Sequence, residues 1–256
     1  MDRFETKRVL ITGAGSGIGQ ATVLRLLSEG ATVVGADVSA DGLAGTTALA
    51  EAAGTAGRLT VRPLDIADET AVAAVVTAAV EHLGGLDVLV NAAGILRAGH
   101  THECDLDVWN LVIGVNLTGT FLVTRAALPA LLATGAGVVV NFSSTAAAFG
   151  HPYMAAYAAS KGGIQSFTHA IATEYGRQGL RAVAVAPGGI RSGITETTAG
   201  MLPADCDWKL FAKMGALLGE GFAEPEVIAS AIAMMASDDG RFITGTELRI
   251  DGGAHG

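Results

Sequence analysis

Short runs of β-branched and other apolar residues alternate along the chain with longer runs rich in alanine and leucine. Most of the short runs are apolar at every position, which is typical of strands that are covered by helices on both faces. We expect strands at residues 8–12, 32–37, 59–64, 86–91, 137–141, 181–186 and 247–250. We expect helices at residues 18–29, 68–83, 107–134, 153–178 and 225–237.

This alternation predicts the α/β class, with right-handed βαβ units that build a doubly wound parallel sheet of the Rossmann type. Ligands of such sheets bind at the carboxyl ends of the strands, near the switch in strand order. No linker, low-complexity tract or repeat divides the chain, so we expect one domain over residues 1–256. Residues 189–222 are poorly patterned but carry apolar side chains, and we expect them to form a lid over the substrate.

Composition narrows the class of partner. The formal net charge is −9, and no run of lysine and arginine is present to neutralise phosphates, so a nucleic-acid partner is not expected. No uninterrupted apolar stretch reaches the roughly 18 residues of a membrane span, and no targeting segment is visible. Cys104 and Cys206 lie far apart, which predicts neither a disulfide framework nor a metal site and favours the reducing cytoplasm.

A glycine-rich turn stands between the first predicted strand and the first predicted helix. Its glycines permit a sharp turn and a close approach of the backbone to a pyrophosphate, and the helix that follows offers free N–H groups to phosphates. A turn of this kind also serves close packing of strand and helix, but its position between the two favours phosphate binding. The candidate residues are Gly13, Gly15, Ser16, Gly17, Ile18 and Gly19.

An acid ends the second predicted strand. Asp37 lies 18 residues past Gly19, near the spacing expected for the residue that binds the adenosine ribose. Its carboxylate would accept hydrogen bonds from the ribose hydroxyls and would repel a 2′-phosphate. Ser16 carries no charge that could neutralise such a phosphate. Together the two residues predict NAD rather than NADP.

Further cofactor contacts are expected at the ends of the next strands. Asp65 follows the third strand, where an adenine edge could be held, although it is equally suited to the start of a helix. The small residues after the fourth strand would let the backbone lie against the cofactor. The candidates in these positions are Val38, Asp65, Ile66, Asn91, Ala92 and Gly94.

Tyr157 and Lys161 stand four residues apart in a predicted helix, so their side chains share one face. A free tyrosine has a pKa near 10, and a nearby ammonium lowers that pKa toward neutral pH. The pair can then exchange a proton with an alcohol or a ketone. Ser144 ends the fifth strand 13 residues earlier, where its hydroxyl can polarise a substrate oxygen. Asn116 is a poor residue for a helix interior, which indicates a polar role such as holding a water.

The order and spacing of these motifs resemble the short-chain dehydrogenase/reductase family, in its single-domain form, from Thr12 to Gly253. The resemblance implies a sheet order of 3-2-1-4-5-6-7 and a homotetramer or dimer in which helices 107–134 and 153–178 pack against their copies. It implies Tyr157 as general acid and base, Lys161 as the residue that lowers the tyrosine pKa and binds the nicotinamide ribose, Ser144 at the carbonyl and Asn116 at a relay water. It adds a site for the carboxamide at Pro187, Gly188, Ile190 and Ser192.

The chain departs from the family pattern at three positions. Ala92 and Val183 stand where the family often has asparagine, and Ser192 stands where it has threonine. Ala92 and Val183 put local strand hydrogen bonds in doubt. None of the three departures removes a group that the chemistry needs.

The expected substrate is a secondary alcohol or ketone, of the hydroxysteroid, cyclic alcohol or 3-oxoacyl thioester type. Two alternatives remain: a non-catalytic NAD(H)-binding sensor or scaffold, and an epimerase or dehydratase that retains NAD. His151 is expected to be solvated. The candidate pocket residues are Ile95, Leu96, Ala146, Phe149, Met154, Gly189, Met201, Trp208, Phe211 and Met214.

Overall fold

The computed structural model describes residues 3–211, 214–219 and 221–255. Across these residues, parallel strands form a seven-stranded sheet in the order β3-β2-β1-β4-β5-β6-β7, which confirms the predicted fold class and strand order. Each predicted strand is present to within two residues at either end. The strands are β1 (Arg8–Thr12), β2 (Thr32–Asp37), β3 (Leu59–Pro63), β4 (Val88–Asn91), β5 (Val138–Phe142), β6 (Arg181–Pro187) and β7 (Thr246–Ile250).

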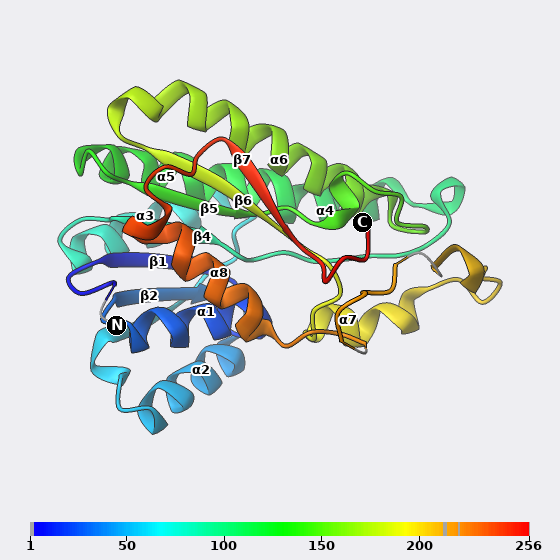
Figure 1. The fold of residues 1–256 in the computed structure, drawn as a ribbon, viewed down its shortest axis with the longest axis horizontal. Coiled ribbons are helices and arrows are strands. Elements are labelled where there is room, and N and C mark those ends of the chain that lie inside the picture. The colour runs from blue at the N-terminus through cyan, green and yellow to red at the C-terminus, as the bar shows by residue number, and fades with distance from the viewer. Residues whose placement is uncertain (1–2, 212–213, 220, 256) are drawn as a thin grey trace.

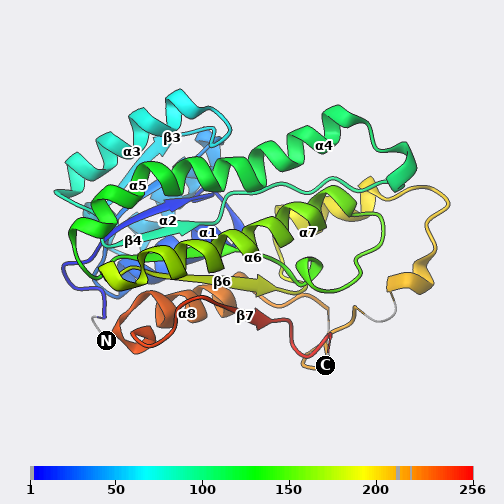
Figure 2. The ribbon, with the colours of Figure 1, turned by 90° about the horizontal axis from the view of Figure 1, so that it is seen from above.

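Helices cover both faces of this sheet (Figure 1, Figure 2). One face carries α1 (Gly17–Ser28), α2 (Ala40–Ala52) and α8 (Pro225–Ala236). The opposite face carries α3 (Glu69–Leu83), α4 (Leu106–Ile113), α5 (Thr120–Ala133) and α6 (Ala155–Tyr175). The short helix α7 (Gly193–Thr198) lies beyond the carboxyl ends of the strands (Figure 1).

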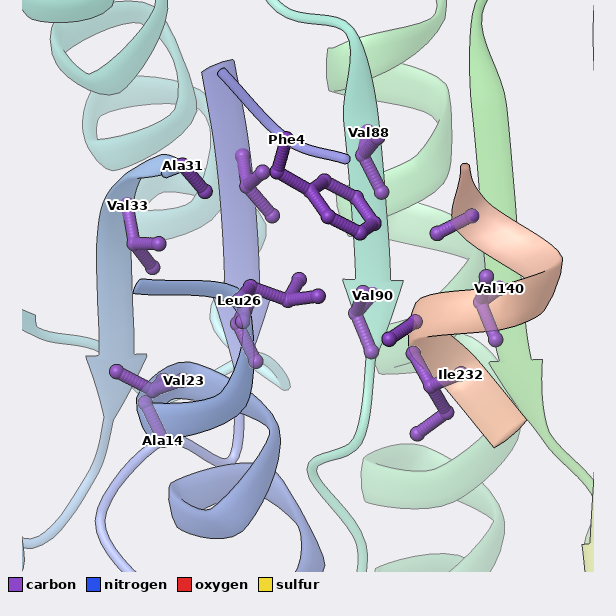
Figure 3. Close-up of a cluster of buried hydrophobic side chains, with 14 of the residues drawn as sticks. Phe4, Ala14, Val23, Leu26, Ala31, Val33, Val88, Val90, Val140 and Ile232 are labelled. Atoms are coloured by element: carbon purple, nitrogen blue, oxygen red, sulfur yellow. The ribbon is translucent and has the colours of Figure 1, made fainter. Parts of the chain in front are cut away.

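The central strands are apolar on both sides because each side faces a separate core. In β1, Val9 and Ile11 enter the cluster beneath α1 and α8, whereas Leu10 between them enters the cluster beneath α3, α5 and α6. Figure 3 shows the first cluster, in which Phe4 and Ile232 reach the sheet from opposite ends of the chain. Each buried side chain of this size contributes about 1.5–3 kcal/mol, so the two cores hold the strand ends in fixed positions.

Two helices were missed by the sequence analysis. α2 buries only Leu43, Thr46 and Ala50, so its apolar stripe is too weak to stand out among the surrounding alanines and threonines. α7 has six residues and lies inside the poorly patterned stretch 189–222. Its start is fixed by a reciprocal cap, in which the Ser192 hydroxyl accepts from the Thr195 N–H and the Thr195 hydroxyl accepts from the Ser192 N–H.

The predicted single helix at 107–134 is wrong in one respect, because its middle is a π-helical turn. The turn Gly114–Gly119 separates α4 from α5 and contains Asn116. One wide turn shifts the side chains that follow it around the helix axis, and such turns are frequent at functional sites. Here it accompanies an inward-facing, fully buried Asn116.

The continuous segment Leu106–Ala133 is long and apolar enough to cross a membrane, with a mean hydropathy of 1.5. The sequence analysis did not find it because single polar residues interrupt the apolar run. In the structure 44% of an 18-residue window of this segment is buried, and the segment packs against α3 and α6. Its composition is therefore accounted for by its place in the core of the sheet's second face.

Candidate active site

A cleft of about 440 Å³ runs along the carboxyl ends of the strands, where doubly wound sheets bind ligands. It extends from the end of β3 to the start of α7, and most of the predicted site residues line it. These are Gly13, Ser16, Gly17, Ile18, Gly19, Asp37, Val38, Asp65, Ile66, Ala92, Gly94, Ser144, Tyr157, Lys161, Pro187, Gly188, Ile190 and Ser192.

Three predicted residues do not line the cleft, and each supports one of its walls. Asn91 is buried in β4, where its amide donates to the Thr124 hydroxyl at 2.9 Å and to the Asn141 side chain at 2.8 Å. Gly15 lies within the glycine turn and bonds Asp37, and Asn116 lies behind the loop after β4 and bonds Ile95.

The glycine turn packs closely against the backbone of the loop after β4. Gly13 has a φ of 72°, and a Cβ at this position would lie 2.6 Å from the Ala93 nitrogen. Helix α1 begins after Ser16 without a side-chain cap, so the first N–H groups of the helix remain available at the cleft. An uncapped helix start beside a glycine-rich turn fits a pyrophosphate.

Asp37 lies at the far end of the same cleft. Its Oδ2 accepts from the Gly15 N–H at 2.9 Å, and its Oδ1 accepts from the Ser39 N–H at 2.8 Å. The two bonds hold the carboxylate against the glycine turn, and each oxygen has lone pairs to spare. Together with the turn, this arrangement fits the ribose and pyrophosphate of a dinucleotide.

Tyr157 and Lys161 lie in the first turns of α6, at the other end of the cleft. The Lys161 side chain is 5% exposed, and its Nζ donates to the Phe142 carbonyl at 2.8 Å. Burial lowers the pKa of Lys161 to about 8. Burial also raises the pKa of the Tyr157 phenol, and a hydrogen bond with the Ser144 side chain opposes that rise. Nζ lies 5.6 Å from the centroid of the tyrosine ring.

The side chain of Asn116 is committed to the protein. Its Oδ1 accepts from the Ile95 N–H at 2.8 Å, and its Nδ2 donates to the Ile95 carbonyl at 2.9 Å and to the Ser160 hydroxyl at 3.0 Å. Ser160 precedes Lys161 in α6. Asn116 thus ties the loop after β4 to the helix that carries the tyrosine and the lysine.

The structure adds residues that the sequence motifs did not reveal. Several of these residues lie at or directly after the end of a strand, and that position alone could have identified them. Arg97 and the residues of α7 belong to no sequence motif, so no signal in the sequence indicated them. The additional lining residues are Ala36, Leu64, Ala93, Arg97, Leu111, Val115, Phe142, Ser143, Gly193, Ile194 and Thr195.

Of the proposed substrate-pocket residues that the structure describes, only Ile95 lines the cleft. Phe211 stacks on Tyr153 with ring centroids 6.1 Å apart, and Trp208 is 63% exposed. Phe149 stacks instead on His255, at 4.3 Å. These side chains pack on one another outside the cleft, which the sequence order could not show.

His151 is not simply solvated, contrary to expectation. Its Nε2 lies 3.2 Å from the Thr145 hydroxyl, and burial lowers its pKa to about 4. The imidazole is therefore neutral at physiological pH.

Comparison with known proteins agrees with this arrangement. The profile of a family described as enoyl-(acyl carrier protein) reductase matches residues 13–255. A 3-oxoacyl-[acyl-carrier-protein] reductase of Thermotoga maritima is 38% identical over 251 residues, which cover 98% of each chain. The cis-4-hydroxycyclohexanecarboxylate dehydrogenase of Sinomonas cyclohexanicum is 40% identical over 255 residues, again 98% of each chain.

Solved structures agree as well. The crystal structure of levodione reductase superposes with a TM-score of 0.89 at 35% identity and covers 98% of each chain. The sheet order, the cleft and these relatives lead to one conclusion. The chain belongs to the short-chain dehydrogenase/reductase family, whose members are nicotinamide-dependent oxidoreductases that act on alcohol and ketone groups.

Proposed function

We propose that this protein is an NAD(H)-dependent oxidoreductase that interconverts a secondary alcohol and a ketone. The observation that carries the proposal is the single cleft that joins Asp37 at one end to Ser144, Tyr157 and Lys161 at the other. A dinucleotide is an extended ligand with a ribose near one end and its reactive ring at the other. One cleft therefore has the layout that such a ligand needs.

The adenosine end selects NAD(H) in this proposal. Asp37 accepts hydrogen bonds from the ribose hydroxyls and repels a 2′-phosphate. Ser16 at the uncapped start of α1 offers no cation to offset that repulsion. Val38, Asp65 and Ile66 line this part of the cleft and would hold the adenine.

At the other end the nicotinamide, when bound, accepts or gives up the hydride. The backbone at Ala92 and Gly94 would lie along it, with Asn91 as a support from behind. Gly15 would support the adenosine end through its hydrogen bond to Asp37. The carboxamide is held by a separate group of residues after β6, which fixes the orientation of the ring. These are Pro187, Gly188, Ile190 and Ser192.

The proton moves through the tyrosine. Tyr157 takes the hydroxyl proton of an alcohol or returns it to a ketone, while the Ser144 hydroxyl hydrogen-bonds the same substrate oxygen. Because burial raises the pKa of the phenol, an opposing charge is needed to bring it toward neutral pH. The ammonium of Lys161 supplies that charge and binds the nicotinamide ribose. Asn116 fixes the loop at Ile95 and supports the relay water.

The protein works as one domain over residues 1–256, with residues 189–222 as a substrate lid that begins with α7. Residues 212, 213 and 220 of this lid lie outside the described residues. The lid is supported by its position beyond the strand ends, where α7 lines the cleft (Figure 1).

A homotetramer or dimer is supported by an apolar surface on the second face of the fold. Leu106, Trp109 and Phe121 are 70%, 37% and 40% exposed on α4 and α5, and Phe121 meets Phe167 of α6 edge-on. Exposed aromatic side chains are enriched at protein interfaces. The cytoplasm as location is supported by the free thiols Cys104 and Cys206.

Substitution of the tyrosine tests the reaction. We expect Tyr157→Phe to lower kcat by about 100-fold to 10,000-fold, the usual contribution of a general acid or base. We expect its Kd for NAD to stay within about twofold, because only the phenol oxygen is lost. Tyr175→Phe, at the far end of α6, serves as the matched control and should retain full activity. Wild-type turnover in Tyr157→Phe would refute the assignment.

The same assay separates the alternatives. The substrates are hydroxysteroids, cyclic alcohols and 3-hydroxyacyl thioesters, and the readout is NADH absorbance together with product. One NADH per product indicates a dehydrogenase. Product without net NADH indicates an epimerase or a dehydratase, and NAD binding without product from any of these substrates indicates a sensor.

A further inference from the structure

The charges along the cleft are unevenly distributed. Of the described lining residues, four carry a formal charge at neutral pH: Asp37, Asp65, Arg97 and Lys161. The two acids follow β2 and β3, at the adenosine end of the cleft. Lys161 is buried, and its Nζ donates to the Phe142 carbonyl. Arg97 is thus the one cation of this set that has no role in the proposed chemistry.

Arg97 lies in a loop that is fixed on both sides near the tyrosine. On one side, Asn116 binds the N–H and the carbonyl of Ile95 at 2.8 and 2.9 Å. On the other side, the Gly99 N–H donates to the Tyr153 carbonyl at 2.9 Å, one helical turn before Tyr157. The loop follows β4. In the sheet, β1 lies between β4 and β2, the strand that ends in Asp37. Arg97 therefore belongs to the substrate end of the cleft.

The guanidinium of Arg97 has donors to spare. Its Nη1 donates to the carbonyl of its neighbour Leu96 at 2.8 Å, and within the described residues it forms no ion pair. Some arginines of this acidic chain are paired, as Arg8 is with Asp87, whereas Arg181 uses several of its donors on backbone carbonyls. A guanidinium carries five N–H donors in a plane, a geometry that matches a carboxylate.

We propose that Arg97 binds a carboxylate of the substrate, so that this enzyme acts on a hydroxy acid or an oxo acid whose carboxylate lies several atoms from the reacting carbon. This inference rests on the proposed function. The apolar side chains of Ile95 and Ile194, which also line the cleft, contact the carbon skeleton between the two polar ends. Arg97 then fixes which end of the molecule faces Tyr157, and it distinguishes an acid from a neutral alcohol of the same shape.

The test compares two probes of matched shape, 4-hydroxycyclohexanecarboxylate and its methyl ester. The wild-type enzyme is expected to have a lower KM for the acid. Because a hydrogen bond to a charged group contributes about 1.5–3 kcal/mol, Arg97→Gln should raise the KM for the acid about tenfold to a hundredfold. The KM for the ester should stay within about twofold in Arg97→Gln. Arg177→Gln, an exposed arginine in the turn after α6, is the control and should leave both values unchanged.

A binding measurement keeps this test independent of turnover. Cyclohexanecarboxylate has no hydroxyl to oxidise, and its Kd is measured by calorimetry on the NADH-loaded enzyme. Weaker binding of cyclohexanecarboxylate to Arg97→Gln, but not to Tyr157→Phe, supports the proposal. If no alcohol is oxidised, that failure refutes only the proposed reaction and leaves this binding result valid. Three results would each refute the role of Arg97. They are an equal rise in KM for the acid and the ester in Arg97→Gln, unchanged binding of cyclohexanecarboxylate, and a loss of affinity for NAD instead of the carboxylate.

Discussion

The backbone N–H of Gly15 donates to Oδ2 of Asp37 across 2.9 Å, so the glycine turn and the acid at the end of β2 form one unit. A Cβ on Gly15 would lie 2.9 Å from the carboxyl carbon of Asp37, which explains why the second glycine of the turn has no side chain. The aspartate therefore has two separable roles. It supplies a charge toward the ribose, and it supplies an acceptor for the turn.

These two roles separate in a pair of variants. Asp37→Asn keeps an acceptor for Gly15 but removes the charge, and Asp37→Ala removes both. We expect the ratio of kcat/KM for NAD over NADP to fall about tenfold or more in both variants, because repulsion of the 2′-phosphate is relieved. We expect only Asp37→Ala to lose about 1 kcal/mol of unfolding free energy, measured in urea. A wild-type preference for NADP would refute the ribose argument.

Removal of the Asn116 side chain should destabilise the loop after β4. Asn116→Ala leaves the N–H and the carbonyl of Ile95 without their partner, and unpaired polar groups of this kind cost about 1–3 kcal/mol. We expect a matching loss of unfolding free energy in urea and a large drop in kcat. Asn110→Ala, on the exposed side of α4, is the control and should change neither. An unaltered stability of Asn116→Ala would contradict this interpretation.

The buried ammonium of Lys161 should cost stability at neutral pH. Its pKa falls from 10.5 to about 8 on burial, so the unfolded chain binds more protons than the folded chain between these values. The wild-type protein should therefore gain about 3 kcal/mol relative to Lys161→Met as the pH rises from 8 to 10.5. Paired urea titrations of the cofactor-free proteins measure this difference. The control variant Lys209→Met, at an exposed position, should show no such change in its stability difference from the wild type. A stability difference between wild type and Lys161→Met that does not change with pH would contradict the burial argument.

The segment 189–222, which we propose as a lid, is connected to the loop after β4 by an ion pair. His100 Nε2 lies 2.9 Å from Asp205 Oδ1, and the Asp207 N–H donates to the Tyr153 hydroxyl at 2.9 Å. The hydrogen bond to Asp205 raises the pKa of His100, and the same bond lowers the pKa of Asp205. The ion pair between His100 and Asp205 is thus fully formed below the ordinary histidine pKa of about 6.5. It is lost as the pH rises through the raised pKa of His100.

Trp208 reports on this contact because it neighbours Phe211, which stacks on Tyr153. In a Trp109→Phe background, we expect Trp208 fluorescence to change with a midpoint above pH 6.5. His102 and Glu103 also face this site, with 3.6 Å between them, so His102→Gln is measured alongside. His100→Gln should abolish the transition, whereas the exposed His169→Gln should leave it intact. A transition that persists in His100→Gln would rule out the ion pair as its cause.

The sequence analysis succeeded where a local pattern sets the structure. The strands of the sheet were found because burial on both faces requires continuous apolar runs, as Val9, Leu10 and Ile11 illustrate. The glycine turn and Asp37 were found because a strand, a tight turn and a helix must follow one another in the chain. α2 was missed because only three of its residues face the core.

The candidate site divides in the same way. The amino-acid sequence alone determined the fold and the family, and it identified Ser144, Tyr157 and Lys161 as candidates, because spacing along a helix or after a strand is a local property. Only the tertiary structure decided that Asn116 binds Ile95, that Phe211 stacks on Tyr153, and that Arg97 lines the cleft without an ion pair among the described residues. Those relationships join segments distant in the chain, and their geometry follows from how the helices pack on the sheet.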